Sequence, residues 1–553
     1  MFTLMNKPKV EKKSATSDGI AGLTVALVNI PEGMAYSLVA KINPLYGLYS
    51  GIIPPIMAGL FASSAFMVVT FTNEMALMTM TLMGEMGEEV SVGVLFMFTI
   101  MIGLWQILFG VLKLGTFMRF VSQSVMTGFV TGLALLVILG QVGEITGSHS
   151  EYQNKVLAVV DILARPGSWD IPTLVAGIIM IVLIVALLKT PLRKIALISA
   201  LVITSILVYV ANWNTVHLVG EITDINASLP LPTLPEIASI PDLIVPSLAT
   251  AILGIAVSAG VAQYYLNPDG NRADPNRDFI GLGAANAVGG IFQSAPSCGS
   301  LSRTAVVVSA GAKTRMANIF SGIIMAIAII TIIPLANMIP MPALAALLIY
   351  VGFETINEQR ILRGWKTHLI GRIAMIVTFV MTLTVNIINA FMWGILISLA
   401  LYIYQSSLNA HVKELIPLEG DHFKEQEPPK EFPSNQVTVL TVYGSQYFAS
   451  VETMRKKLPS AENLKNAAII FVDREMTETS NTFITWIQDY SKRMQASGNR
   501  LIMAEINPKV KAQLVEAKAL KIIGEENVFV SEPKIGVSIV DAIAEANDWL
   551  KKR

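Results

Sequence analysis

Apolar runs long enough to cross a lipid bilayer follow one another through the first 410 residues of this 553-residue chain. A transmembrane helix needs about 20 apolar residues. The predicted spans form two sets of seven, and the third span of each set is short. They are 17–40, 44–63, 72–84, 92–112, 116–142, 171–188 and 195–212, then 243–265, 278–293, 299–312, 315–339, 341–356, 370–386 and 388–408. The predicted fold class is an α-helical polytopic membrane protein.

The composition agrees with this class. Hydrophobic residues make up 53% of the chain and charged residues only 14%, whereas soluble domains average about 25% charged residues. The formal net charge is zero, so no overall field favours a nucleic-acid partner. The single cysteine, Cys298, excludes an internal disulfide framework and a cysteine-based zinc cluster. The first apolar run, to Ala40, is longer than a signal-peptide core and lacks a cleavage site, so it is predicted to be an uncleaved span.

Basic residues in the loops predict the orientation of the chain, because Lys and Arg gather on the cytoplasmic side. With the N-terminus inside, the loops that follow even-numbered spans are cytoplasmic. Those loops contain Lys113, Arg119, Lys189, Arg193, Lys194, Arg272, Arg277, Lys313, Arg315, Arg360, Arg363, Lys366 and Arg372. The outer segment Glu85–Glu89 is acidic and the outer loop 213–242 has no Lys or Arg, whereas the outer loop 144–170 carries Lys155 and Arg165 as an exception. We therefore expect a multi-pass protein of the cell (inner) membrane with both termini in the cytoplasm.

The two sets of spans are predicted to be inverted repeats. An odd number of spans per half forces the second half to run in the opposite direction to the first. A short echo supports the repeat, because Gly59–Ser64 (GLFASS) resembles Gly290–Ala295 (GIFQSA). The expected transport domain covers residues 17–410, with 17–212 and 243–408 as the repeats, after a cytoplasmic segment 1–16.

The chain changes character after the last predicted span. Residues 411–435 are charged and contain prolines, which predicts a linker. From residue 436 to 553 the pattern alternates strand and helix, as in a small α/β domain whose helices pack on a sheet. This domain follows an inward-ending span, so it is expected in the cytoplasm.

Two hydrophobic stretches are interrupted at corresponding places in the two halves. Residues 66–74 (FMVVTFTNE) and 292–304 (FQSAPSCGSLSRT) each place extended or turn-forming residues before an apolar, helix-like run. Hydrocarbon tolerates broken backbone only where protein buries it or where it lines a cavity. Paired interruptions of this kind are the usual indication of a transporter's binding site. We therefore predict two half-helices whose N-termini face each other around a small anion.

Four segments resemble the SulP anion transporter family, which includes the sulfate permeases and the solute-carrier anion exchangers. The segments are Gly22–Tyr49 with its Ile-Pro-Glu-Gly-Met-Ala-Tyr motif, Gly128–Gly132, Asp274–Asn286, and Gly299–Ala305 with Gly311–Thr314. Residues from 436 onward resemble a STAS domain. The resemblance implies 14 transmembrane segments in a uracil-permease-like 7+7 inverted repeat, with a mobile core (spans 1–4 and 8–11), a gate (spans 5–7 and 12–14) and a homodimer. It also implies that the anion binds between the N-termini of spans 3 and 10.

The chemistry of the interrupted segments suits an anion. A helix N-terminus offers unpaired N–H groups and about half a positive charge. Arg303 adds a full charge, and an arginine inside the membrane is a functional hypothesis by default. The alternative is that Arg303 reaches an interface or pairs structurally with a carboxylate. The candidate substrate-binding residues are Glu32, Tyr36, Thr72, Asn73, Glu74, Ser258, Gly299, Ser300, Leu301, Ser302 and Arg303.

Coupling to an ion points to two carboxylates. Glu32 follows Pro31 in the first span, and a buried glutamate can carry a proton. Glu74 lies in the first turn of the predicted half-helix, where it either contributes to coupling or only stabilises the helix end. Span eight has Val257 where many relatives have an acid, so coupling through that span is not expected. The coupling ion would be H+ or Na+, and no cofactor, metal or catalytic residue is predicted.

The predicted function is secondary transport of a small inorganic anion, of the bicarbonate, sulfate or chloride class, by an elevator-type movement. One alternative keeps the fold and changes the ligand to a dicarboxylate or a nucleobase. Another is a membrane-anchored signalling or scaffold protein that acts through the STAS domain with a cytoplasmic partner. That domain has Asn481 where related domains carry a phosphorylated serine, which favours a packing, dimerisation or trafficking role.

Overall fold

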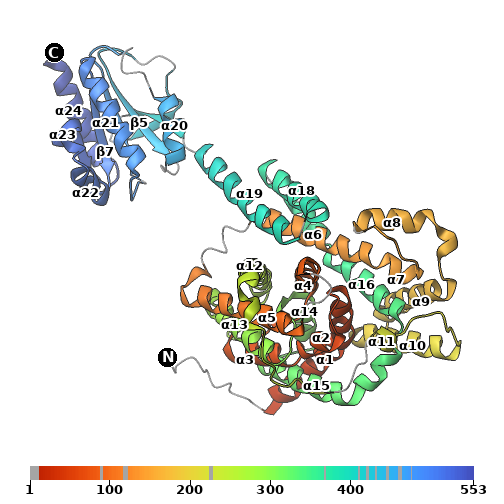
Figure 1. Cartoon of the computed structure of the whole chain (residues 1–553). Helices are drawn as coiled ribbons and strands as arrows, with labels where there is room; N and C mark the ends of the chain where they lie inside the picture. The colour runs from red at the N-terminus through yellow and green to blue at the C-terminus, as the bar shows by residue number, and fades with distance from the viewer. Residues whose placement is uncertain are drawn as a thin grey trace. The chain divides into compact units, whose positions relative to one another are not determined.

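The computed structural model divides into two compact units, Met1–Ser398 and Leu399–Arg553 (Figure 1). It describes residues 12–86, 91–115, 122–152, 154–222, 228–366, 369–385, 387–408, 411–418, 422–429, 433–443, 448–458, 464–474 and 476–552. Most of the predicted N-terminal segment 1–16, most of the acidic segment 85–89 and the start of the predicted span 116–142 therefore lie outside the described residues.

The first unit, the membrane unit, is helical. Its helices are α1 (Lys12–Val39), α2 (Pro44–Tyr49), α3 (Ile53–Phe61), α4 (Asn73–Met86), α5 (Val92–Val111), α6 (Gln123–Gly140), α7 (Val142–Thr146), α8 (Lys155–Ala164), α9 (Ile171–Leu188), α10 (Ala196–Val210), α11 (Val219–Ile222), α12 (Ile240–Tyr264), α13 (Pro275–Ile291), α14 (Leu301–Ser309), α15 (Met316–Ile332), α16 (Met341–Thr355), α17 (Glu358–Lys366), α18 (Leu369–Thr384) and α19 (Ile387–Leu408), the last of which contains the boundary between the units.

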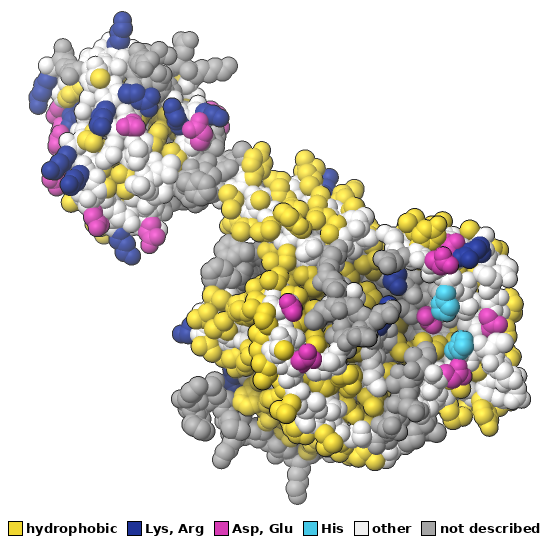
Figure 2. Space-filling view, viewed as in Figure 1, with side chains coloured by type: hydrophobic (Ala, Val, Ile, Leu, Met, Phe, Trp, Pro, Cys, Tyr) yellow, Lys and Arg dark blue, Asp and Glu magenta, His cyan; other side chains and the backbone are white. Residues whose placement is uncertain are grey.

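Hydrophobic side chains cover most of the visible face of the membrane unit, whereas charged side chains gather on the second unit (Figure 2). Among the described residues, seven helices are long and apolar enough to cross a membrane, and the shorter apolar helices include α10, α15 and α18. The predicted class of polytopic helical membrane protein is confirmed. The second predicted span, 44–63, consists of the two helices α2 and α3.

The helices of the membrane unit pack in two groups. In one group α13 packs on α5 and α3, α12 packs on α5, and α15 packs on α1 and α3. In the other group α6 packs on α18 and α16, and α9 packs on α16 and α10. The first group contains the predicted core segments and the second contains the predicted gate segments. We call them the core and the gate.

Two buried carboxylates fix the chain next to the interrupted segments. Asp278 in α13 accepts hydrogen bonds from the backbone N–H groups of Ser63 (2.8 Å) and Ser64 (2.7 Å), just before the first interrupted segment. Asp18 in α1 accepts bonds from the N–H groups of Lys313 (2.6 Å) and Thr314 (3.0 Å), just after α14. Charged acceptors make stronger hydrogen bonds than neutral ones, so both segments are tied to core helices that lie far away in the sequence.

The second unit, the C-terminal unit, is an α/β domain around a six-stranded sheet of order β4-β3-β5-β6-β7-β8. The strands β5 to β8 are parallel, and β3 and β4 are antiparallel. The elements are β3 (His411–Pro417), β4 (Phe423–Gln426), β5 (Val437–Tyr443), α20 (Phe448–Lys457), β6 (Ala468–Val472), α21 (Asn481–Ala496), β7 (Arg500–Ile506), α22 (Pro508–Glu516), α23 (Leu520–Ile523), β8 (Val528–Val530) and α24 (Val537–Lys551).

The predicted linker 411–435 is wrong over much of its length. Residues 411–417 and 423–426 form β3 and β4, and β3 pairs with β5 so that His411 lies opposite Tyr443. The charged side chains that suggested a linker lie along an edge hairpin, where Glu414 and Glu425 meet solvent or other polar groups. Charged side chains are typical of edge strands because they discourage further pairing. The C-terminal domain therefore begins at residue 411.

We predict that a fragment 411–553 is more stable than a fragment 436–553. The shorter fragment loses β3, including Val412, which is 2% exposed in the core of the domain, and it uncovers the edge of β5. Burying one such side chain contributes roughly 1.5–3 kcal/mol. Urea unfolding followed by circular dichroism should give a free energy of unfolding lower by at least about 2 kcal/mol for the shorter fragment. Equal stabilities would show that the hairpin is only an appendage.

Candidate functional site

The two interrupted segments pair with each other. Strand β1 (Val68–Thr70) and strand β2 (Cys298–Ser300) are antiparallel, and Val69 lies opposite Gly299. The half-helix α4 begins three residues after β1, and the half-helix α14 begins directly after β2. The half-helices therefore leave the strand pair in opposite directions, and their N-termini lie close to its two ends. Residues at both helix starts, including Asn73 and Arg303, are buried in the membrane unit.

Buried polar contacts hold the strand pair in place. Asn286 in α13 donates to the carbonyl of Ser297 (2.8 Å) and accepts from its N–H (2.7 Å), and it also donates to Gln106 in α5 (2.9 Å). Thr304 in α14 accepts from the N–H of Val68 (3.1 Å) and so joins the two segments. Because buried polar groups are costly unless they are bonded, these contacts specify one geometry for the interrupted backbone.

Arg303 is the charged centre of the site. It lies in the first turn of α14 and is 1% exposed. One terminal nitrogen, Nη1, donates to the carbonyl of Phe71 just before α4 (2.7 Å), and the other, Nη2, lies 2.8 Å from Oε2 of Glu32 in α1. Its guanidinium carbon lies 5.6 Å from the ring centroid of Tyr36, and the Tyr36 ring meets Phe71 edge-on. Arg303 thus connects both half-helix starts to α1.

The Nε atom of Arg303 is buried and has no hydrogen-bond partner among the described residues. The Oδ1 atom of Asn73, at the start of α4, is likewise buried without a partner in the described part of the chain. A buried donor without a partner costs about 1–3 kcal/mol. Such a donor on a guanidinium at a helix N-terminus is a suitable place for an anion or for an ordered water.

The alternative in which Arg303 pairs with a carboxylate is the one that the structure shows. Its partner is Glu32, which is 4% exposed and follows Pro31 inside α1. Glu74 is only partly buried and forms no ion pair with the described residues, although it stands in the first turn of α4 as predicted. The Glu32–Arg303 pair is electrically neutral when both groups are ionised. The helix N-termini and the remaining donors then supply the positive potential of the site.

Gly299 and Ser258, two of the predicted binding residues, contact each other. The N–H of Gly299 donates to the hydroxyl of Ser258 in α12 (2.8 Å), and that hydroxyl donates to the carbonyl of Gly254 (2.6 Å). A Cβ atom on Gly299 would lie 2.8 Å from the sulfur of Met67 and 3.1 Å from Cα of Ser258. The backbone of β2 therefore packs directly against α12 at Gly299, and both residues hold the strand in place.

The other predicted site residues lie around this centre. The Thr72 hydroxyl lies 3.2 Å from the sulfur of Cys298, which links the end of one segment to the start of the other strand. The hydroxyls of Ser300 and Ser302 lie 3.2 Å apart, and Ser302 is exposed. Leu301 is partly buried at the first position of α14. Glu32, Tyr36 and Arg303 are therefore in direct contact, and the remaining residues flank them.

Two residues of the gate escaped the sequence prediction. Tyr350 in α16 donates a hydrogen bond to Glu354 one turn later (2.5 Å). Both residues lie in the second half of α16, and Glu354 is exposed. An acidic residue near the end of the apolar run 341–356 is the feature of the sequence that could have drawn attention to it.

Comparison with known proteins gives the same picture. A family model described as "Sulfate permease family" matches residues 16–378. A protein called "Probable sulfate transporter 4.2", from Arabidopsis thaliana, is 27% identical over 541 residues and the match covers 93% of this chain and 79% of that protein.

Two solved structures share the fold. Murine Solute Carrier 26 family member A9, an anion transporter solved in its inward-facing state, superimposes with a TM-score of 0.83 at 18% identity, over 99% of this chain and 94% of that one. The transmembrane domain of the cyanobacterial bicarbonate transporter BicA superimposes with a TM-score of 0.60 at 20% identity, over 69% of this chain and 98% of that domain.

We predict that removing one member of the Glu32–Arg303 pair destabilises the protein more than removing both. A single deletion leaves an uncompensated buried charge, which typically costs about 3–5 kcal/mol. Thermal unfolding of the detergent-solubilised protein should therefore give a lower midpoint for Arg303→Ala and for Glu32→Ala than for the double variant. Additive losses in the double variant would mean that the two charges do not depend on each other.

Proposed function

The chain belongs to the sulfate permease family, and on this premise we propose that it is a secondary transporter of a small inorganic anion of the bicarbonate, sulfate or chloride class. At the level of the family it is a membrane transporter rather than an enzyme. The observation that carries the proposal is the buried Arg303, held between the starts of α4 and α14 with its Nε donor facing no protein acceptor among the described residues.

The anion binds between the N-termini of α4 and α14. It loses hydration near the middle of the bilayer, where the backbone N–H groups of two helix starts and the Arg303 guanidinium replace the water. Hydroxyl and amide groups that flank this centre, from Thr72, Asn73 and Ser300, add donors that tolerate several anions. The site therefore selects for charge and size more than for one chemical species.

Transport proceeds by an elevator-type shift of the core against the gate. The bound anion contacts core elements, because α4, α14 and Arg303 all belong to the core, whereas α16 presents Tyr350 and Glu354 from the gate. Rigid movement of one bundle past the other exposes a fixed site alternately to the two sides. Both termini lie in the cytoplasm, the protein forms a homodimer, and the C-terminal unit is a STAS domain that contributes packing or partner binding.

A proton couples to the anion through Glu32. When Glu32 is ionised it neutralises Arg303, and the site attracts anions weakly. Protonation of Glu32 removes its negative charge and leaves the guanidinium to the incoming anion, so proton and anion bind together. Glu74 is the less favoured carrier, because it is only partly buried and lies outside the ion pair.

Uptake into proteoliposomes tests the proposed function. We expect labelled sulfate, bicarbonate or chloride to accumulate inside the proteoliposomes. The Glu32→Ala/Arg303→Ala variant should have an initial uptake rate at least about tenfold lower, because hydrogen bonds to charged groups contribute roughly 1.5–3 kcal/mol. Parallel assays with fumarate and uracil examine the dicarboxylate and nucleobase alternatives. Uptake of uracil alone would overturn the anion proposal, and absence of any uptake would favour the scaffold alternative.

We predict that Glu32→Gln removes the dependence of uptake on a proton gradient. The amide resembles the protonated carboxyl group, so Arg303 is available to the anion at every pH. Initial rates with and without an inward proton gradient should converge in this variant, whereas Glu221→Gln, which alters an exposed carboxylate on α11, should keep the wild-type ratio. An unchanged ratio in Glu32→Gln would assign coupling to another group, and sodium-dependent uptake would replace the proton with Na+.

A further inference from the structure

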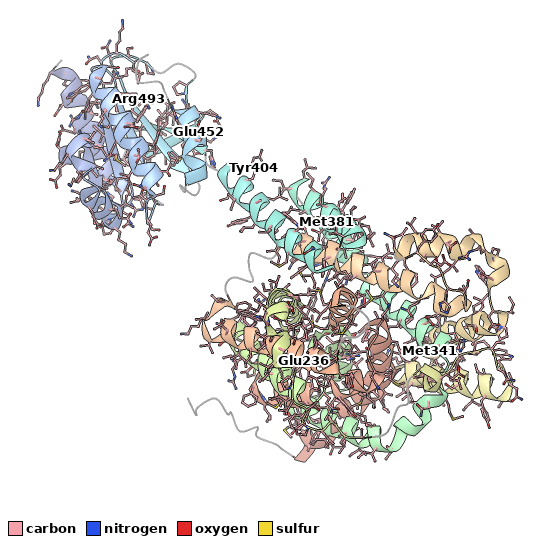
Figure 3. The ribbon with its side chains drawn as sticks, viewed as in Figure 1. Glu236, Met341, Met381, Tyr404, Glu452 and Arg493 are labelled. Carbon is pink, nitrogen blue, oxygen red and sulfur yellow. The ribbon has the colours of Figure 1, made fainter. Side chains whose placement is uncertain are left out.

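A cavity of about 500 Å³ lies between the core and the gate, apart from the Arg303 site. It is partly open and is lined by the end of α1 and the turn after it, by α4, by the end of α6, by the first half of α16, and by α7 and α8. Its wall is largely apolar and includes Met341 at the start of α16, which is labelled in Figure 3. The polar groups that line it are Lys41, Asn43, Gln141, Glu144 and Lys155.

The two cations of this cavity are unusual for the face on which they lie. The predicted outer loops contain only three basic residues, Lys41, Lys155 and Arg165. Arg165 forms an ion pair with Asp161 within α8. Lys41 and Lys155 both line the cavity, and neither has an ion pair within 4.0 Å in the described part of the chain. Two of the three basic residues of the predicted outer loops, Lys41 and Lys155, therefore line the same cavity.

Local structure holds Lys155 over the cavity. Asn154 caps α8 by accepting a hydrogen bond from the N–H of Val156 (2.9 Å), which sets the direction of the first helical residue, Lys155. The Cε atom of Lys155 lies 4.0 Å from the position of a Cβ atom on Gly140. Burial and then the like charge of Lys41 lower the pKa of Lys155, and only Glu144 opposes this effect. Two lysines and one carboxylate line the cavity, so a net positive charge remains and creates a positive potential.

The cavity and the Arg303 site share two helices. On α4 the lining residues of the cavity are Leu77 and Met80, which lie about one and two turns beyond Asn73. On α1 the lining begins at Leu38, two residues after Tyr36, whose ring meets Arg303. Both helices therefore have residues at the cavity and at the site.

The size of the cavity favours a hydrated guest. Water occupies about 30 Å³ per molecule in the liquid, so the volume suits an anion with roughly a dozen waters rather than a bare anion in direct contact. Two lysines at such a distance act through their field, which raises the local concentration of anions and their rate of entry.

We propose that this cavity is an entry site that captures the transported anion in its hydrated form. Lys41 and Lys155 attract the anion, and the negative charge of Glu144 partly opposes them. The inference rests on the proposed function for its role in transport. The potential in the cavity is a property that can be measured without transport. Loss of either lysine should therefore weaken capture without altering the step at Arg303.

The variant Lys155→Cys tests the potential directly. The native Cys298 is fully buried, so an impermeant thiol reagent reacts at the introduced position. The rates of an anionic and a cationic methanethiosulfonate are measured, each relative to a free thiol, and adding Lys41→Gln should lower the ratio of the anionic to the cationic rate about two- to fivefold, as expected for one unit charge several ångströms away. Sulfate, bicarbonate and chloride are added as probes and should slow the anionic reagent. If adding Lys41→Gln does not change the ratio of the anionic to the cationic rate, the proposal is wrong even if the protein transports anions.

Transport by the same variant tests the role. At low ionic strength, Lys155→Cys should raise the KM for anion uptake from this face roughly two- to fivefold with an unchanged maximal rate. Modification with the cationic reagent should restore the KM, and Glu144→Gln should lower it. The matched control is Arg165→Cys, whose charge is already paired in α8 and whose loss should leave the KM unchanged. If the wild type transports anions and Lys155→Cys has the same KM, the entry-site proposal is wrong and the proposed transport function is unaffected.

Discussion

The membrane unit depends on one buried arginine. Arg303 lies on a half-helix that begins inside the bilayer, and its guanidinium reaches the carbonyl that precedes the other half-helix and a carboxylate on α1. A lone charge in this environment would be prohibitive. The ion pair with Glu32 compensates the charge of Arg303. The hydrogen bond to the carbonyl of Phe71 joins the start of α14 to the residues just before α4 through the Arg303 side chain.

The two interrupted segments are possible inside the membrane unit because their backbone N–H and C=O groups hydrogen-bond to each other. A single extended segment would leave N–H and C=O groups unpaired inside the bilayer. Here β1 and β2 exchange backbone hydrogen bonds, and Asn286, Thr304 and Ser258 cover polar groups at the edges of the pair. Several polar groups near the helix starts are therefore used to hold the backbone. In the proposed site, the donors available to an anion are the helix N-termini and the Nε of Arg303, which has no hydrogen-bond partner among the described residues.

Charged residues lie at more than one place along the boundary between the core and the gate. Glu354 lies near the end of α16 in the gate, whereas Lys41, Lys155 and Glu144 line the cavity beside the first half of that helix. Charges at a boundary between two bundles change their distances when the bundles move, whereas charges within one bundle do not. Under the proposed elevator-type movement, the field at a bound anion would therefore change from one stage to the next.

The sequence by itself determined the class of protein, the interrupted segments and the charged residues worth attention, because each leaves a local trace. Apolar length identifies spans, the alternating strand and helix pattern after residue 436 indicates the α/β domain, and a charge within an apolar run marks Glu32 and Arg303. Membership of the family was predictable from its motifs for the same reason.

Only the tertiary structure decided which groups meet. It paired Arg303 with Glu32, it packed Gly299 against α12, and it showed that residues 411–417 of the predicted linker form a strand. It also gathered Lys41 and Lys155 at one cavity. These outcomes depend on the register of helices and strands that are far apart in the chain, and neither composition nor periodicity contains that information.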